Sequence, residues 1–65
     1  MNENTLKGNW KDLKGSVQEK WGELTDDDMD RIEGKADQLA GAIQKRYGRS
    51  QEEAKKEVND WLDNS

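Results

Sequence analysis

The chain has 65 residues and a formal net charge of −4, and charged residues make up 40% of it against 29% for hydrophobic ones. It contains no Cys, His or Pro. These absences exclude disulfides, zinc and haem sites built on Cys or His, and every catalytic dyad or triad that needs those side chains. So short a chain predicts a single domain over residues 1–65, with frayed ends at residues 1–4 and 63–65.

Apolar residues recur at steps of three and four along the chain, and no segment alternates as a strand does. This period predicts helices near residues 4–21, 26–31, 34–47 and 51–62, and therefore an all-α fold. The apolar stripe runs from the second helix into the third, but Gly34 favours a break, so we predict two helices there. The residues predicted to define the core are Trp10, Leu13, Val17, Trp21, Leu24, Ile32, Leu39, Ile43, Tyr47, Val58 and Trp61.

The six glycines fall into two sets, at 8, 15 and 22 and at 34, 41 and 48, each spaced by seven, and the sets are 26 residues apart. Segments 13–22 and 39–48 share the pattern Leu-x-Gly-x-(Val/Ile)-Gln-x-(Lys/Arg)-aromatic-Gly. A helix-capping signal follows each segment, at Thr25 and at Ser50. The sequence therefore predicts an internal repeat in which a helix ends at a left-handed glycine, Gly22 or Gly48, and a capped helix follows.

The glycines inside the predicted helices are unusual, because each costs roughly 0.5–1 kcal/mol relative to alanine. At about 100° per residue, they lie opposite the apolar stripe of their helix. One interpretation is a solvated face that tolerates an inherited repeat. A second is a bare backbone ridge that receives another helix or a partner, and a third is a deliberately low stability of the fold. The residues concerned are Gly8, Gly15, Gly34 and Gly41.

A run of acidic residues follows Thr25. Asp26, Asp28 and Asp30 have the spacing that opens a calcium loop, but such a loop needs Gly at its sixth position, where Arg31 stands. The first turn of a helix explains the run better, because the macrodipole favours negative charge there, and we predict no metal site. The candidate interaction surface combines this run with the glycines: Gly8, Gly15, Gly34, Gly41, Asp26, Asp27, Asp28 and Asp30.

Other kinds of site find little support. The basic cluster of Lys45, Arg46 and Arg49 is short in a chain of negative net charge, so nucleic acid is not an expected partner. No glycine motif for binding phosphate occurs, and the serines have no His to activate them. We therefore expect no enzymatic activity and no cofactor. We expect a monomer, for which a protein partner of unknown identity stays open.

The chain has no run of about 18 apolar residues and no apolar N-terminal stretch, so we predict a cytoplasmic protein without stable membrane insertion. An alternative places the first helix on a membrane surface, with lysines at 7, 11 and 14 near the headgroups and Trp10 and Trp21 as interfacial anchors. Acidic residues on the other flank oppose this alternative. A small domain also needs its tryptophans to fill the core.

Several segments resemble the CsbD-like family of small bacterial proteins, and the resemblance covers residues 6–62. It rests above all on Trp21-Gly22-Glu23-Leu24-Thr25-Asp26-Asp27-Asp28 and on Gln44-Lys45-Arg46-Tyr47-Gly48. The resemblance implies a four-helix domain of two crossed helical hairpins, similar to the arrangement of SAM domains. It also implies a cytoplasmic protein that accumulates under general stress, such as osmotic stress or entry into stationary phase. The family offers no catalytic residues to transfer.

The expected function is therefore that of a non-enzymatic general stress-response protein. Its high glycine content and strong hydrophilicity resemble those of hydrophilins, which are thought to protect by hydration and weak contacts. The competing hypothesis is a specific protein-interaction module that uses the glycine ridge or the acidic run from Asp26 to Asp30. Association with a membrane surface through the first helix is the second alternative.

Overall fold

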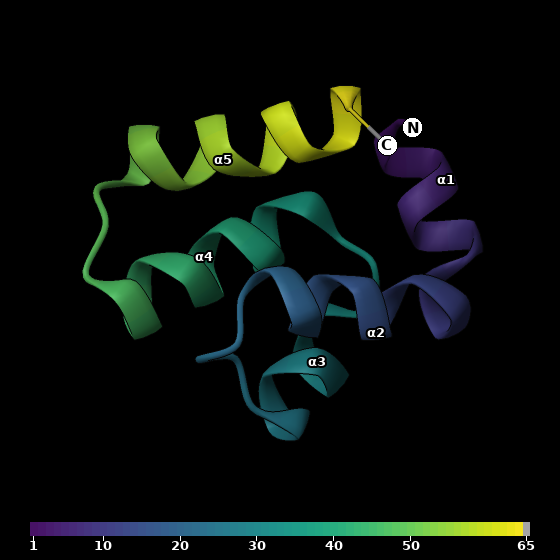
Figure 1. Ribbon diagram of the computed structural model, residues 1–65, viewed down its shortest axis with the longest axis horizontal. Coiled ribbons are helices and arrows are strands. Elements are labelled where there is room, and N and C mark those ends of the chain that lie inside the picture. The colour runs from purple at the N-terminus through teal and green to yellow at the C-terminus, as the bar shows by residue number, and fades with distance from the viewer. Residues whose placement is uncertain (65) are drawn as a thin grey trace.

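The computed structural model describes residues 1–64, and over these residues the chain folds into helices and connecting turns without strands (Figure 1). The all-α class predicted from the sequence is confirmed. Five helices follow one another: α1 (Glu3–Gly8), α2 (Trp10–Lys20), α3 (Asp26–Ile32), α4 (Ala36–Tyr47) and α5 (Gln51–Asp63). The radius of gyration of 10.4 Å is close to the roughly 11 Å expected for a compact domain of this length.

The two longest helices, α4 and α5, form an antiparallel hairpin (Figure 1). Helix α4 ends at Gly48, whose φ of +65° is left-handed, as predicted for this glycine. Ser50 then caps α5 with a full capping box, in which its hydroxyl accepts from the amide of Glu53 and the Glu53 carboxylate accepts from the amide of Ser50. Because the connection is only three residues long, α5 folds straight back over α4.

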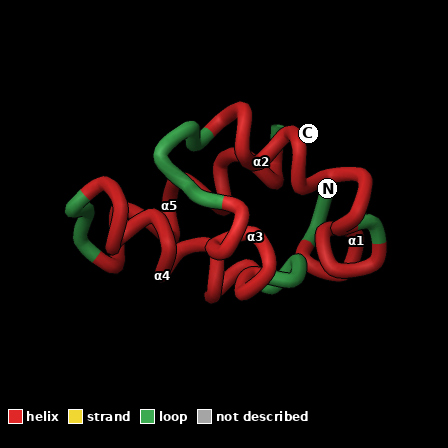
Figure 2. The backbone as a smooth tube through the Cα atoms, turned by 90° about the horizontal axis from the view of Figure 1, so that it is seen from below, coloured by secondary structure: helices red, strands yellow, loops and turns green. Residues whose placement is uncertain are grey.

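The predicted first helix over residues 4–21 is wrong in one respect, because the chain breaks at Asn9 into α1 and α2. Gly8 and Asn9 are both poor helix formers, and their low propensity outweighs the apolar stripe that continues through them. The break turns α1 away from α2 and toward the far end of α5 (Figures 1 and 2). The domain thus has five helices over its described residues where four were expected. The SAM-domain-like crossing of two hairpins and the internal repeat stay predictions.

The break at Gly34 is confirmed. Glu33 and Gly34 both have positive φ, of 50° and 80°, and they reverse the chain between α3 and α4. Gly34 is also pressed against α1, where a Cβ at its position would lie 2.7 Å from Lys7 Cα and 2.9 Å from the carbonyl oxygen of Leu6. The turn therefore requires glycine twice, once for its dihedral angle and once for its close approach to another backbone.

Most of the predicted core residues are buried, with Trp10, Leu13, Tyr47 and Trp61 half-buried at the edge of the core. Leu6, Met29 and Leu62 are buried as well, although they were not among the core-defining positions. Two alanines, Ala40 on α4 and Ala54 on α5, are buried too. All described large hydrophobic side chains are at least partly covered.

The turn after α2 and the end of α5 differ in detail from the predicted elements. Gly22 does not take a positive φ; α2 ends at Lys20 with Trp21 as its C-cap, and the amide of Glu23 donates to the hydroxyl of Tyr47 at 3.0 Å. At the N-terminus Asn2 caps α1, and the terminal amine donates to the carbonyl of Leu62 at 2.9 Å. Fraying of residues 1–4 stays a prediction. At the other end α5 continues to Asp63, and residue 65 lies outside the described residues.

Replacing Gly15 with alanine is expected to stabilise the protein by about 0.5–1 kcal/mol, the usual difference between the two residues inside a helix. Gly15 lies in the middle of α2, and a Cβ there would meet nothing within 4 Å. The midpoint of urea unfolding, followed by far-UV circular dichroism, should rise. A fall in the midpoint would mean that the bare backbone at Gly15 contacts something within the folded domain.

Candidate functional site

The acidic run that dominates the candidate surface begins helix α3. Asp26, Asp27 and Asp30 are exposed, whereas Asp28 is only 4% exposed. Its carboxylate accepts from the amide of Thr25 at 3.0 Å and from the Arg46 guanidinium through Nε at 2.8 Å and Nη2 at 3.2 Å. Asp28 is therefore not part of an interaction surface. It closes the capping box of α3 and ties this helix to α4.

The contacts of Asp28 hold the pKa of its carboxyl well below the usual range. The largest cause is the hydrogen bond from Arg46, followed by the hydrogen bond from the Thr25 amide, and burial opposes both. Both hydrogen bonds are donated to the carboxylate oxygens, so they stabilise the ionised form and lower the pKa. The same pairing raises the pKa of Arg46, which keeps its positive charge.

Acidification is therefore expected to weaken the fold through Asp28. A lowered pKa in the folded state stabilises the protein at pH values above the unfolded pKa of about 3.9, and this stabilisation is lost as the pH falls toward the folded value. The unfolding free energies of the natural chain and of Asp28→Asn should differ most near pH 7, and the gap should shrink steadily between about pH 4 and pH 2. A gap that stays constant over this range would contradict an ionised Asp28 in the folded protein.

The predicted glycine ridge does not form one surface. Gly34 is buried under α1, so it serves the fold and is not available to a partner. Gly8, Gly15 and Gly41 are exposed, on α1, α2 and α4 respectively, and a Cβ at any of them would meet nothing within 4 Å. No other helix packs on these glycines within the described residues, so the interpretation of an internal docking ridge is wrong for them. Binding of a separate partner there stays a prediction.

An aromatic cluster that joins α2, α4 and α5 lies at one edge of the core. The rings of Trp21 and Trp61 meet edge to face, with centroids 5.7 Å apart. The indole nitrogen of Trp21 donates to Glu57 at 3.4 Å, and the other Glu57 oxygen pairs with Arg49. Arg49 in turn lies over the ring of Tyr47, 5.5 Å from its centroid. Sequence reasoning missed Glu57, because a charge on an amphipathic helix carries no signal of its partner in another element.

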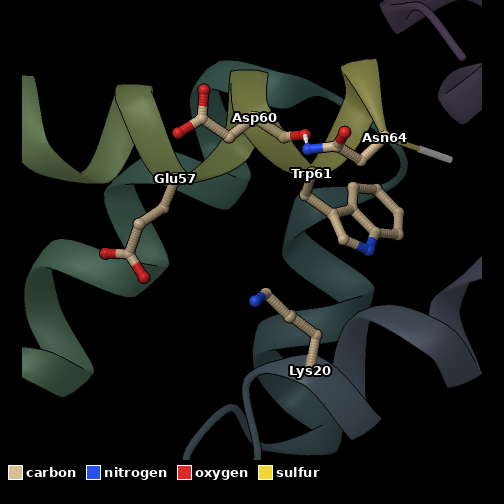
Figure 3. Close-up of a pocket in the computed structure, with 5 residues that line it drawn as sticks. All are labelled: Lys20, Glu57, Asp60, Trp61 and Asn64. Atoms are coloured by element: carbon tan, nitrogen blue, oxygen red, sulfur yellow. Dashed lines mark hydrogen bonds between the residues drawn. The ribbon is translucent and has the colours of Figure 1, made fainter.

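A shallow groove of about 250 Å³ lies beside this cluster, between α2 and α5 (Figure 3). The Lys20 side chain extends from α2 toward α5, below the Trp61 ring (Figure 3). The acidic side chains of the lining already have partners, since Glu57 pairs with Arg49 and Asp60 with Lys56 at 3.1 Å. The groove thus offers an aromatic wall and one cation, Lys20, that has no ion-pair partner among the described residues. Its lining residues are Lys20, Glu57, Asp60, Trp61 and Asn64.

The membrane alternative loses one of its anchors. Trp21 is only 3% exposed and packs on Trp61, so it is not available to a lipid surface. Over residues 1–64 the structure contains no helix that is both long and apolar enough to cross a bilayer. Within the same residues, no three His, Cys, Asp or Glu side chains come together in a way that would hold a metal ion.

These features define a small, all-helical, highly charged domain whose acidic run contributes one buried carboxylate, that of Asp28, to the fold. The chain belongs to the CsbD-like family, which matches residues 4–56. It is similar to UPF0337 protein YjbJ of Escherichia coli K12, with 61% identity over 61 residues that cover 94% of this chain and 88% of the relative. It is also similar to UPF0337 protein PA4738 of Pseudomonas aeruginosa, with 49% identity over 97% of both chains. No solved structure matches the chain significantly.

Proposed function

We propose that this protein is a non-enzymatic general stress-response protein of the bacterial cytoplasm, and that it protects other macromolecules by hydration and weak contacts when water is scarce. The observation that carries the proposal is the character of its surface. Charged residues make up 40% of the chain, the mean hydropathy is −1.41, and all the large hydrophobic side chains among the described residues are at least partly covered.

Such a surface suits a protein that accumulates to high concentration. Exposed apolar patches drive association, and a surface without them stays soluble while holding water through its charged groups. The negative net charge adds mutual repulsion between copies. The fold keeps its few apolar side chains in one small core, which leaves most of the chain in contact with solvent.

The proposal is tested by survival under osmotic shock in a strain that lacks the gene and is complemented with variants. The decisive variant is Asp27→Lys with Asp30→Lys, which reverses two exposed charges on α3 and spares the buried Asp28. Bulk protection predicts survival equal to that given by the natural chain at the same protein level. A matched control reverses two exposed charges elsewhere, in Glu19→Lys with Asp63→Lys.

A specific interaction module is the second candidate, and the exposed cluster of Asp26, Asp27 and Asp30 favours it. This candidate predicts that survival falls with the α3 variant and not with the control, while circular dichroism shows both variants folded. Cross-linking in stressed cells should then capture one reproducible partner that the α3 variant no longer captures. Equal survival with both variants would contradict the module.

A further inference from the structure

A hollow of about 170 Å³ lies between α3 and α4, away from the groove beside Trp61. Its floor includes Ile32 at the end of α3 and the small residues Gly41 and Ala42 in the middle of α4. Since a water molecule occupies about 30 Å³, the hollow has room for a group of roughly five or six non-hydrogen atoms. The lining residues are Asp28, Arg31, Ile32, Gln38, Gly41, Ala42 and Lys45.

The charge of this hollow is positive. Arg31 and Lys45 are exposed, and neither forms an ion pair with another described residue. The only acidic side chain in the lining is Asp28, whose charge is already matched by Arg46. The lining therefore carries two cations that have no ion-pair partner among the described residues, and Gln38 adds an amide that can donate a hydrogen bond. By the same reasoning the groove beside Trp61 has one such cation, Lys20.

Gly41 explains why the hollow exists. It lies inside α4, where glycine is unfavourable, and a Cβ at its position would meet no atom within 4 Å. Packing against α3 therefore does not require a glycine. Gly41 is part of the lining, so a side chain at this position would take up some of the open space beside it. Because Gly41 lies inside α4, its amide is already used in the helix and is not available to a ligand. Its contribution to the hollow is the absence of a side chain.

We propose that the hollow between α3 and α4 binds a small oxyanion, a phosphate or carboxylate group, held by Arg31 and Lys45 over the bare backbone at Gly41. A guanidinium presents paired N–H donors that match the oxygens of either group, and a lysine adds a point charge. Asp27 and Asp30 lie on the same short helix as Arg31 and weaken anion binding. Oxyanion binding in this hollow would be independent of the stress role proposed above.

The experiment is a titration of the 15N-labelled protein with sodium phosphate, sodium acetate or sodium chloride at equal ionic strength, followed by amide shifts. We expect saturable shifts at Gly41, Ala42 and Lys45 with phosphate or acetate, and none at Gly15. The arm with the tighter curve identifies the preferred oxyanion. Shifts that rise linearly in all three salts, or that spread over the whole chain, would overturn the proposal.

Variants of the hollow make the test specific. Arg31→Gln should weaken binding by about tenfold, the scale expected for losing a charge-assisted hydrogen-bond pair, while the matched control Lys11→Gln on α2 should leave it unchanged. Gly41→Ala should weaken binding although it stabilises the helix, and Gly15→Ala should stabilise without affecting binding. Asp27→Asn should tighten binding because it removes a repelling charge. Equal affinity in Arg31→Gln and Lys11→Gln would refute the site.

Discussion

Gly34→Ala is expected to destabilise the domain by about 3 kcal/mol or more, enough to unfold much of a protein this small. Two costs combine. A left-handed φ costs a residue with a Cβ roughly 1–2 kcal/mol, and φ here is +80°. The new Cβ would also lie 2.7 Å from Lys7 Cα, so the backbone of α1 must move, and forced repacking of this kind adds about 1–3 kcal/mol. Urea unfolding followed by circular dichroism measures the loss.

Substitutions at two other glycines distinguish the cost of the left-handed φ from the cost of the steric clash. Gly48 has a φ of +65° but open space around it, so Gly48→Ala should show the dihedral cost alone, about 1–2 kcal/mol. Gly41 is helical with open space, so Gly41→Ala should stabilise. If Gly34→Ala were no more damaging than Gly48→Ala, the close approach of the α3–α4 turn to α1 would not exist in solution.

Asp28→Ala should lower the unfolding free energy by about 2–3 kcal/mol. Asp28 is the acidic partner of Thr25 in the capping box of α3. Losing this part of the cap costs about 1 kcal/mol. Removing the acid also leaves Arg46 without the partner that its guanidinium contacts through two nitrogens. The Arg46 side chain is 33% exposed, so water replaces part of the lost interaction and the total stays below the 3–5 kcal/mol typical of a fully buried pair.

The exposed neighbour Asp27 provides the matched control. Asp27→Ala removes an acid from the same helical turn without touching the capping box, and it should change stability by less than about 0.5 kcal/mol. A double-mutant cycle of Asp28→Ala with Arg46→Gln then isolates the pair, and its coupling energy should be clearly above zero. Purely additive effects would show that Asp28 acts only as a cap.

Helix caps and helix ends could be predicted, because they depend on residues that are close together in the sequence. Both capping boxes, at Thr25 and Ser50, follow from a hydroxyl and an acid three residues apart. The stop at Gly34 and the left-handed Gly48 follow from the freedom of glycine. The break at Asn9 was missed because the apolar period is continuous there, although two adjacent poor helix formers, Gly8 and Asn9, stand at the break. The packing of Gly34 on α1 is a contact between distant residues that no local pattern indicates.

Pairing between distant elements could not be predicted from one sequence. The acidic run and the basic residues before Gly48 were both noticed, but nothing local indicates that Asp28 turns inward to meet Arg46 while Asp27 stays in water. The hollow between α3 and α4 was missed for the same reason. The sequence alone shows that Gly41 lowers the stability of its helix. It does not show that Gly41 lines the same hollow as Arg31, which lies on another helix.

The α4–α5 hairpin has a consequence for how the chain reaches its structure. Its two helices are neighbours in sequence, joined by three residues and an immediate cap, so the largest helix pair forms without closing a long loop. Chains rich in such short-range pairs fold within microseconds to milliseconds. We expect rapid-mixing experiments to show refolding on this scale. The protein would then regain its fold on the same timescale each time it returns from a denaturing to a native solvent.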